Sequence, residues 1–453
     1  MSFQNSKNIN LILNGPISYT LYKLALPNIF AVFMYSAVTF SEVWYISRVS
    51  IDELASLALV FPFVSLVGMI GLGAIGGGIT SSLSRAIGKN DKDLANKILW
   101  HSVLLMTFLS FIFLLFFVFF SNKIFHIIGA EEIVVSRSVV FTQIFFSFAP
   151  VMFYSYFFIS VFRGCGSYQH LAKITIVTNV SQVLLSGVLT LGFWFFPQLG
   201  LIGIAISTIA CQGIAAIYMF VYIIRGNFNI SFKIYSFDKN IIVDILRVGG
   251  VSSINAISIT LTMVIVTFFV SGYGTAAIAG HGICLRLEQM LIPLAFGVGG
   301  VLTTIVGMNF GAKNFKRAKK ISWLGALIIG FLATGIGSIV AISPDIWINI
   351  FTDDSDAFLI ASRYLIVVGP VFGIFAAGKT LYFASMGTGK MIIPVSAGLT
   401  RLLIVSLFGV LVTYFSLDII FLFFGVALGL SVIGIILIIN MFKKAWNPVL
   451  IIE

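Results

Sequence analysis

Five charged side chains lie within long apolar stretches of the 453-residue sequence: Glu42, Arg286, Glu288, Lys379 and Arg401. A charge surrounded by apolar residues is costly, so it usually serves a function or pairs with an opposite charge. A carboxylate that leaves water holds its proton more tightly. In a cavity that alternately fills with water and empties, Glu42 could therefore load and release a proton.

Each of these residues also has a structural interpretation. Glu42 lies near the outer end of its apolar stretch, close to Trp44 and Arg48, so it could extend to the membrane surface. Glu288 and Arg401 could line the substrate cavity, or Glu288 could form ion pairs with Lys379 or Arg401 that only hold helices together, and we keep both interpretations open. Arg286 stands two residues before Glu288, so the two point to different sides of a helix and do not simply neutralise each other.

Polar side chains follow a single helical face in three of the apolar stretches. They are Asn28, Tyr35, Thr39 and Glu42 in the first, Thr175, Asn179, Gln182, Ser186 and Thr190 in the fifth, and Asn255, Ser258 and Thr262 in the seventh. Such stripes can join helices through dry contacts between polar side chains. Because three stripes occur and one carries a carboxylate, we expect them to line a hydrated substrate cavity.

The elements that carry these residues are predicted to be membrane-spanning helices. Hydrophobic residues make up 59% of the chain and charged residues 9%, a composition that no soluble fold could bury. We therefore predict an all-α polytopic membrane protein with twelve spans. Apolar runs place these spans at 18–47, 54–83, 98–120, 134–162, 171–196, 200–224, 243–271, 276–306, 321–342, 357–384, 392–415 and 419–442.

Basic residues are concentrated in alternate loops, which predicts the orientation of the chain. Loops 84–97, 225–242 and 307–320 and the tail with Lys443 and Lys444 are rich in Lys and Arg, so we expect them to be cytoplasmic. Both termini then face the cytoplasm, in a plasma membrane such as the bacterial inner membrane. The three cysteines, Cys165, Cys211 and Cys284, lie in or beside apolar segments and predict no disulfide framework.

An internal repeat divides the spans into two halves. A shift of 223 residues aligns seven identical residues within 23 positions, among them Gly76 on Gly299 and Thr80 on Thr303. Six spans per half give both halves the same orientation and a pseudo-two-fold axis along the membrane normal, as in transporters with parallel repeats. We expect the substrate path between the halves. The predicted parts are a tail at 1–17, an N-lobe at 18–224, a linker at 225–242, a C-lobe at 243–442 and a tail at 443–453.

The sequence gives little support for an enzyme. The four histidines are scattered and form no His-Glu-x-x-His motif, and the run Gly76-Gly77-Gly78 lacks the lysine of a phosphate-binding loop. We expect no metal, no cofactor beyond a coupling ion, no nucleic acid and no obligatory protein partner. The expected partners are small organic molecules and the lipid bilayer.

These features together resemble the multidrug and toxic compound extrusion (MATE) family of cation-coupled antiporters, over nearly the whole chain. The segments that carry the resemblance are Leu26-Pro27 through Ser41-Glu42-Val43, the Gly-rich end of the second span, Arg163-Gly164-Cys165-Gly166, Arg286-Leu287-Glu288, Val306 to Lys313 and Met386-Gly387-Thr388-Gly389. The resemblance implies export of organic, often cationic and amphipathic, compounds in exchange for H+ or Na+. It also implies a V-shaped pair of lobes with a cation site in the first.

The resemblance implies roles for particular residues of that cation site. The family usually has Asp at the position of Glu42, and its Asn and Thr match Asn179 and Thr208, but its second Asp falls on Ser186. Na+ prefers several hard oxygen ligands with compensating charge, and a single carboxylate supplies little of either. We therefore favour H+ as the coupling ion. A lipid-linked precursor flippase or polysaccharide exporter of related architecture is the alternative function.

Overall fold

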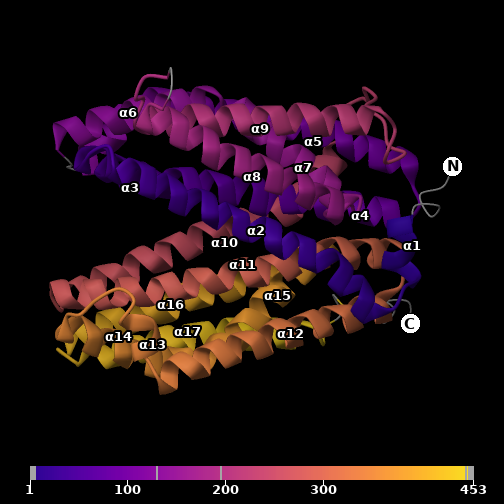
Figure 1. The fold of residues 1–453 in the computed structure, drawn as a ribbon. Coiled ribbons are helices and arrows are strands. Elements are labelled where there is room, and N and C mark those ends of the chain that lie inside the picture. The colour runs from indigo at the N-terminus through magenta and orange to yellow at the C-terminus, as the bar shows by residue number, and fades with distance from the viewer. Residues whose placement is uncertain (1–6, 129–130, 194–195, 444–445, 447–453) are drawn as a thin grey trace. The chain divides into compact units, whose positions relative to one another are not determined.

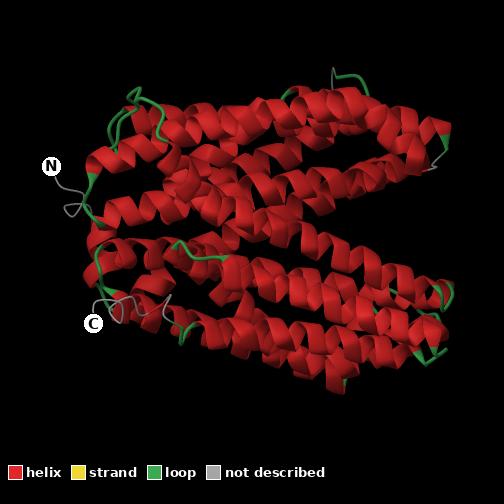
Figure 2. Ribbon diagram, turned by 180° about the vertical axis from the view of Figure 1, so that it is seen from behind, coloured by secondary structure: helices red, strands yellow, loops and turns green. Residues whose placement is uncertain are grey.

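The chain folds into helices joined by short loops (Figure 2). The computed structural model describes residues 7–128, 131–193, 196–443 and 446, and these residues include no strand. The helices are α1 (Lys7–Asn14), α2 (Ile17–Ser47), α3 (Ile51–Gly68), η2 (Met69–Ile75), α4 (Gly76–Gly88), α5 (Lys92–Ile128), α6 (Glu132–Ser147), α7 (Ala149–Gly164), α8 (Tyr168–Leu191), α9 (Leu201–Ile224), α10 (Lys239–Ser271), α11 (Thr275–Gly311), α12 (Phe315–Ile342), α13 (Asp345–Ile348), α14 (Ser355–Val368), η3 (Gly369–Val371), α15 (Phe372–Thr388), α16 (Ile392–Tyr414) and α17 (Ile419–Asn440). The predicted all-α class is confirmed.

The membrane-spanning stretches agree with the prediction from apolar runs. Within the described residues, 11 helical stretches are long and apolar enough to cross a membrane, and the bent pair α6 and α7 brings the number to 12. The second stretch is α3, η2 and α4 read as one, and the tenth is α14, η3 and α15. Each predicted span falls on one of these twelve.

Proline has different effects at different positions. The helix is interrupted at Phe148, two residues before Pro150, where α6 and α7 meet at 54°, and at Pro370, which lies in the short 3-10 segment η3. By contrast, Pro27, Pro62 and Pro293 lie inside continuous helices. A proline removes one backbone hydrogen bond, and whether the helix breaks there depends on the packing around it.

The distribution of side chains is the reverse of that in a soluble protein. Large apolar side chains such as Phe40, Phe119 and Phe331 are more than two-thirds exposed, whereas polar residues such as Ser110 and Asn179 are almost completely buried. Lipid solvates apolar side chains, but a polar group in the hydrocarbon region must find a partner inside the protein. The pattern therefore fits a chain surrounded by lipid.

The helices form two compact units. Unit 1 contains Phe30–Gly249 with the residues up to Asn10, and unit 2 contains Leu11–Ile29 with the residues from Gly250 onward. The boundaries fall inside α1, inside α2 and inside α10, so each of these helices contributes to both units (labelled in Figure 1).

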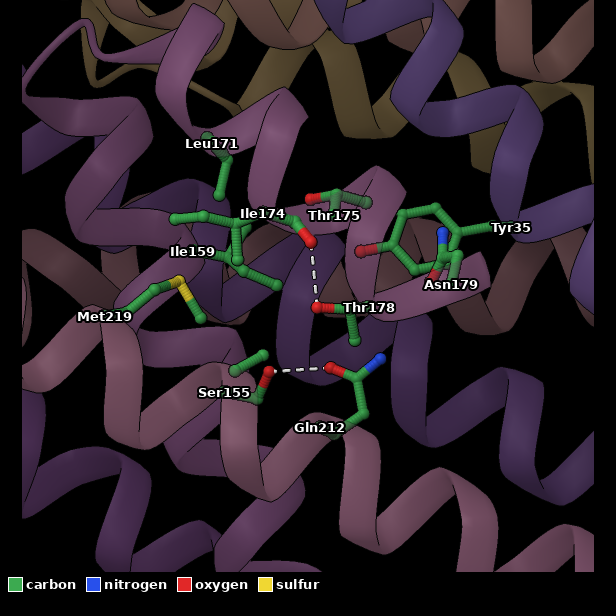
Figure 3. Close-up of a pocket in the computed structure, with 11 residues that line it drawn as sticks. Tyr35, Ser155, Ile159, Leu171, Ile174, Thr175, Thr178, Asn179, Gln212 and Met219 are labelled. Carbon is green, nitrogen blue, oxygen red and sulfur yellow. Dashed lines mark hydrogen bonds between the residues drawn. The ribbon is translucent and has the colours of Figure 1, made fainter. Parts of the chain in front are cut away.

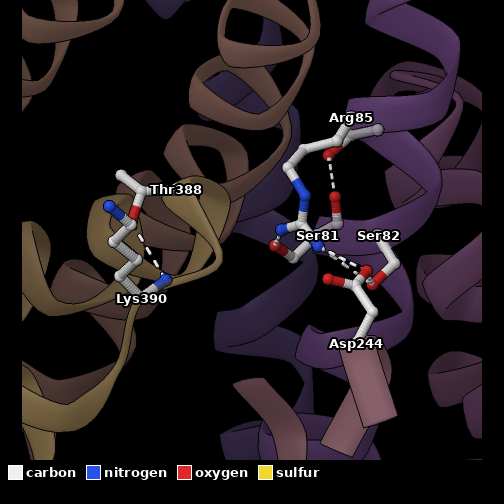
Figure 4. A network of polar contacts seen from close by, with 7 residues as sticks. Ser81, Ser82, Arg85, Asp244, Thr388 and Lys390 are labelled. Atoms are coloured by element: carbon white, nitrogen blue, oxygen red, sulfur yellow. Dashed lines mark hydrogen bonds and ion pairs between the residues drawn. The ribbon is translucent and has the colours of Figure 1, made fainter. Parts of the chain in front are cut away.

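Unit 1 holds the first turns of α10 by a close backbone contact and an ion pair. A Cβ atom added at Gly78 of α4 would lie 2.6 Å from the carbonyl oxygen of Ile245 and 2.9 Å from the nitrogen of Gly249. Nearby, Arg85 Nη2 lies 2.7 Å from Asp244 Oδ2, to which the hydroxyl of Ser82 also donates (Figure 4). Only glycine allows the two helices to approach so closely at this point.

Unit 2 holds the first half of α2 in a comparable way. The side chain of Asn28 donates a hydrogen bond of 2.7 Å to the carbonyl oxygen of Gly297 in α11. The guanidinium group of Arg317 donates hydrogen bonds to the carbonyl oxygens of Ile12 and Gly15. Ile12 lies in the last turn of α1, and Gly15 directly follows this helix. The contact with Ile12 satisfies a carbonyl group that the end of α1 leaves without an intrahelical partner.

The predicted lobe boundaries and linker remain predictions. Parts of both predicted tails, residues 1–6, 444–445 and 447–453 with Lys444 among them, lie outside the described residues. The same holds for residues 194–195 at the end of the fifth predicted span.

Candidate functional site

In unit 1, three polar side chains from three helices form a hydrogen-bonded cluster. The side-chain amide of Gln182 on α8 donates to Oε1 of Glu42 on α2 at 3.0 Å and to Oγ1 of Thr208 on α9 at 2.9 Å. Glu42 is thus turned towards α8, while Arg48 stacks over the ring of Trp44 with 5.0 Å to its centre. The carboxylate therefore contacts polar groups inside the unit, and the interfacial contact is made by its neighbours.

A small pocket lies next to this cluster. Its lining is drawn in Figure 3 and consists of Tyr35, Ser155, Ile159, Leu171, Ile174, Thr175, Thr178, Asn179, Gln212, Ala215 and Met219. Tyr35 on α2 and Asn179 on α8 both lie on the wall of this pocket. The pocket thus brings together side chains from α2, α7, α8 and α9.

Asn179 and Ser186 are the predicted site residues whose polar atoms have no protein partner. Both are at most 1% exposed, and within the described residues neither the amide of Asn179 nor the hydroxyl of Ser186 makes a hydrogen bond. Burying an amide without a partner costs free energy, so such groups usually bind water or a ligand. Asn179 lines the pocket and offers an oxygen and two N–H donors to it.

The size of the pocket restricts what it can hold. Its cavity volume is about 10 Å³, roughly the space that one water molecule needs, whereas sites for drug-sized ligands occupy roughly 300–1,000 Å³. Its lining offers hydroxyl and amide groups. The pocket suits water or a small cation in this conformation, and it is too small for a bulky organic substrate.

The other residues of the two stripes in α2 and α8 divide between the pocket and helix contacts. Thr175 lines the pocket, and Thr190 is buried beyond Ser186. The hydroxyl of Thr39 donates to the carbonyl oxygen of Tyr35 within α2. Asn28 belongs to unit 2 and makes the contact with Gly297, so the first stripe does not line one continuous surface.

Unit 2 contains a second cluster of charged side chains. Glu288 on α11 lies 3.8 Å from Arg401 on α16, measured from Oε2 to Nη2, and the hydroxyl of Tyr364 on α14 donates to its other oxygen. Both charged residues are less than 10% exposed. The ion pair considered in the sequence is present, although at a distance too long for a strong hydrogen bond.

The remaining predicted residues of unit 2 lie in this cluster or pack around it. Lys379 on α15 stacks over the rings of Phe375 and Tyr382, while Arg286 stacks over Phe351 on the other side of α11. Asn255 on α10 lies near the hydroxyl of Tyr382.

Ser258, one turn further along α10, donates to the carbonyl oxygen of Gly398 on α16. At Ser258 the polar stripe of α10 therefore makes a contact with α16.

The structure also adds residues that the sequence analysis did not select. Gln212 on α9 and Ser155 on α7 line the pocket of unit 1 and are hydrogen-bonded to each other at 2.8 Å. Tyr364 holds Glu288, and no periodic stripe includes it. Gln212 is an uncharged polar residue in the middle of an apolar span, and that signal alone could have identified it.

Comparison with known proteins agrees with this architecture. The sequence model of the MatE family matches residues 27–189 and 252–415, once in each half, as expected for an internal repeat. The probable multidrug resistance protein YoeA of Bacillus subtilis is 25% identical over 353 residues, which cover 76% of this chain and 75% of YoeA. The FAD transporter of Shewanella oneidensis is 22% identical over 391 residues, or 83% and 85% of the two chains.

A solved structure has the same fold. It belongs to a MOP superfamily transporter from Pyrococcus furiosus described as having a binding pocket of reverse polarity. It superposes with a TM-score of 0.89 at 18% identity and covers 98% of this chain and 99% of that one. Because the family model matches most of both halves and the fold is shared along the whole chain, this protein belongs to the MatE family of multi-pass membrane transporters, known as multidrug and toxic compound extrusion proteins.

Proposed function

We propose that this transporter is a secondary multidrug exporter that moves organic, often cationic and amphipathic, compounds in exchange for a cation, with H+ favoured over Na+. The name of the Bacillus subtilis relative, a probable multidrug resistance protein, supports the export of drugs. In this proposal the chain alternates between inward-facing and outward-facing states in a plasma membrane, with both termini in the cytoplasm.

The observation that carries the proposal is the arrangement of Gln182, Glu42 and Asn179. Gln182 connects the carboxylate of Glu42 to Thr208, and the adjacent amide of Asn179 is buried without a protein partner. A carboxylate in such a position can change its charge, and the nearby polar atoms can hold the water or ion that accompanies the change.

The ligand set favours H+ as the coupling ion. Glu42 is the single carboxylate of the cluster. Gln182 and Thr208 are neutral, and so are Asn179 and Ser186, which the family resemblance assigns to the same cation site. Na+ in proteins is best held by several oxygen ligands with compensating negative charge, by the same reasoning as for other hard cations. One carboxylate is sufficient for a proton.

Coupling requires that cation and substrate act on the same conformational equilibrium. If protonation of Glu42 and occupancy by substrate exclude each other, each biases the transporter towards a different state. The free energy of the proton gradient then drives the compound out.

The test is efflux of a fluorescent organic cation from everted membrane vesicles that contain the full chain. A pH gradient and a Na+ gradient are applied separately. We expect pH-driven transport in the wild type and its loss in Glu42→Gln, with Glu132→Gln as the matched control because Glu132 is exposed at the start of α6. Unchanged pH-driven transport by Glu42→Gln would remove Glu42 from the mechanism. If expression of this protein leaves the drug tolerance of cells unchanged but alters the composition of the cell envelope, the alternative function as a flippase or polysaccharide exporter would be favoured.

A further inference from the structure

The charged cluster of unit 2 contains more positive than negative charge. Lys379 and Arg401 both lie 5.7 Å from the centre of the Phe375 ring, so the two cations flank one aromatic side chain. Glu288 is the carboxylate that contacts Arg401, and none of the ion pairs among the described residues includes Lys379. One positive charge of the cluster is therefore left without a carboxylate.

Arg401 also retains unused hydrogen-bonding capacity. The residue is 8% exposed, and its Nε has no hydrogen-bond partner within the described residues. The contact with Glu288 involves one terminal nitrogen at 3.8 Å, whereas a guanidinium group has five N–H donors. Tyr364 donates to Glu288, so the carboxylate is held independently of Arg401. The guanidinium group can thus serve a second acceptor without giving up this pair.

The internal repeat identifies this cluster as the counterpart of the pocket in unit 1. The shift of 223 residues maps α7 (Ala149–Gly164) onto 372–387 and α8 (Tyr168–Leu191) onto 391–414, which are almost the bounds of α15 and α16. Under the same shift, Thr178 in the wall of the first pocket corresponds to Arg401, and Ile159 corresponds to Tyr382.

The chemistry of the two equivalent places is therefore different. In unit 1 the position that corresponds to Lys379 is Tyr156, a neutral side chain, and a carboxylate stands nearby in Glu42. In unit 2 the corresponding positions carry an amine and a guanidinium group, and the first-unit carboxylate is replaced by Ile265. Equivalent positions of the two halves therefore carry side chains of different charge, acidic in unit 1 and basic in unit 2.

From these observations we infer that unit 2 contains a binding site for the carboxylate or phosphate group of an aromatic organic compound, with Lys379 and Arg401 as its cationic residues. Arginine binds such groups through several N–H donors, and lysine adds a compact positive charge. Phe375 and Tyr382 border the two cations with aromatic rings. Asn255, which lies near the hydroxyl of Tyr382, adds a polar group next to the site.

The position of Lys379 within a membrane span is consistent with such an anion-binding role. Lys379 stands nine residues before the end of α15, well inside a stretch that is apolar enough to cross the membrane. Such a charge is costly unless it faces water or a partner. The inference deepens the proposed export function, because it adds anionic aromatic compounds to the substrates that the transporter would recognise.

The test is a binding experiment with two probes that differ only in the anionic group. The full-length chain, purified in dodecyl maltoside, is titrated into flavin mononucleotide and into riboflavin, and the fluorescence anisotropy of the flavin ring is followed. Both probes have the same ring, and only the first carries a phosphate. We expect the wild type to bind flavin mononucleotide at least about tenfold more tightly, which corresponds to roughly 1.4 kcal/mol.

Three variants assign that preference to the site. Lys379→Met removes the charge at similar length and is expected to reduce the affinity for flavin mononucleotide to that for riboflavin. Lys379→Arg, which keeps the charge, is expected to restore the preference. Lys390→Met is the control, because this lysine follows α15 at its exposed end. Equal affinities in the wild type, no binding of flavin mononucleotide at millimolar concentration, or a preference that survives in Lys379→Met would each overturn the inference.

A lipid headgroup offers the same phosphate chemistry, so a second arm adds phosphatidylglycerol to the detergent solution. Persistence of flavin mononucleotide binding supports a site for a transported compound. Displacement by stoichiometric lipid would overturn it and assign the site to a headgroup. Binding is measured without transport, so a wild type that shows the preference but exports no compound would contradict the proposed function alone.

Discussion

The side-chain amide of Gln182 donates its two hydrogen bonds to Glu42 and to Thr208, over 3.0 and 2.9 Å. A primary amide has two N–H donors, so both are engaged. Through this one side chain, α2, α8 and α9 meet at the carboxylate that we propose to exchange a proton. A change in the charge of Glu42 therefore acts first on an amide that also holds the neighbouring helix.

Replacement of Gln182 by Met removes both hydrogen bonds at similar side-chain length. Because a hydrogen bond to a charged group contributes about 1.5–3 kcal/mol, we expect pH-driven efflux to fall by roughly tenfold or more. The measurement is the initial rate of efflux from everted vesicles at several values of pH. Gln169→Met on the exposed start of α8 is the control, and equal rates for the two variants would show that the Gln182 contacts have no role.

Replacement of Asn179 by Leu should separate stability from transport. The Asn179 amide makes no hydrogen bond to the described residues, so an apolar side chain of similar volume is expected to leave the melting temperature equal or higher, while it abolishes ion-coupled efflux. Gln212→Leu is the matched comparison, because it breaks the bond to Ser155 and should lower the melting temperature by an amount that corresponds to about 1 kcal/mol. Full transport by Asn179→Leu would exclude a role for this amide in coupling.

A methyl group at Gly78 should destabilise the protein. Its Cβ would lie 2.6 Å from the carbonyl oxygen of Ile245, so α4 and α10 would have to move apart, at a cost of about 1–3 kcal/mol. Gly73→Ala is the control, since a Cβ at Gly73 meets no atom within 4 Å. Thermal melting of the two purified variants is the measurement, and the same melting temperature for both would contradict the contact.

Two arginines of unit 2 should differ in their contribution to stability. Arg401→Met leaves Glu288 buried without its ion-pair partner, which we expect to cost about 3–5 kcal/mol. Arg363→Met breaks a partly exposed pair with Asp418 and should cost about 1 kcal/mol or less. Denaturation of both variants in the same detergent tests the difference. Similar losses would mean that Glu288 finds another partner.

Apolar runs and the repeat were sufficient to predict most of the fold. Because lipid requires every spanning segment to satisfy its own backbone, a run of about 20 apolar residues has few structural alternatives to a helix. The interruptions were harder to predict, since the helix is interrupted two residues before Pro150 but continues through Pro27.

The candidate site was predictable in part. The periodic stripe of α8 correctly groups Thr175, Asn179 and Gln182 on one buried face. The stripe of α2 could not show that Asn28 contacts Gly297 in unit 2, because helical spacing is the same on both sides of the unit boundary. Periodicity within one helix also gives no information on residues of different helices, such as Lys379 and Arg401 around Phe375.

The passage of α2 and α10 from one compact unit to the other has a consequence for biosynthesis. If the polypeptide were severed in the loop after α9, the C-terminal fragment would begin with Lys239–Gly249, and the N-terminal fragment would contain Leu11–Ile29. Each fragment would then carry a segment whose packing surface is present only in the other. We therefore expect neither fragment to bury its exchanged segment alone, so that the two halves, although similar in sequence, depend on each other to fold.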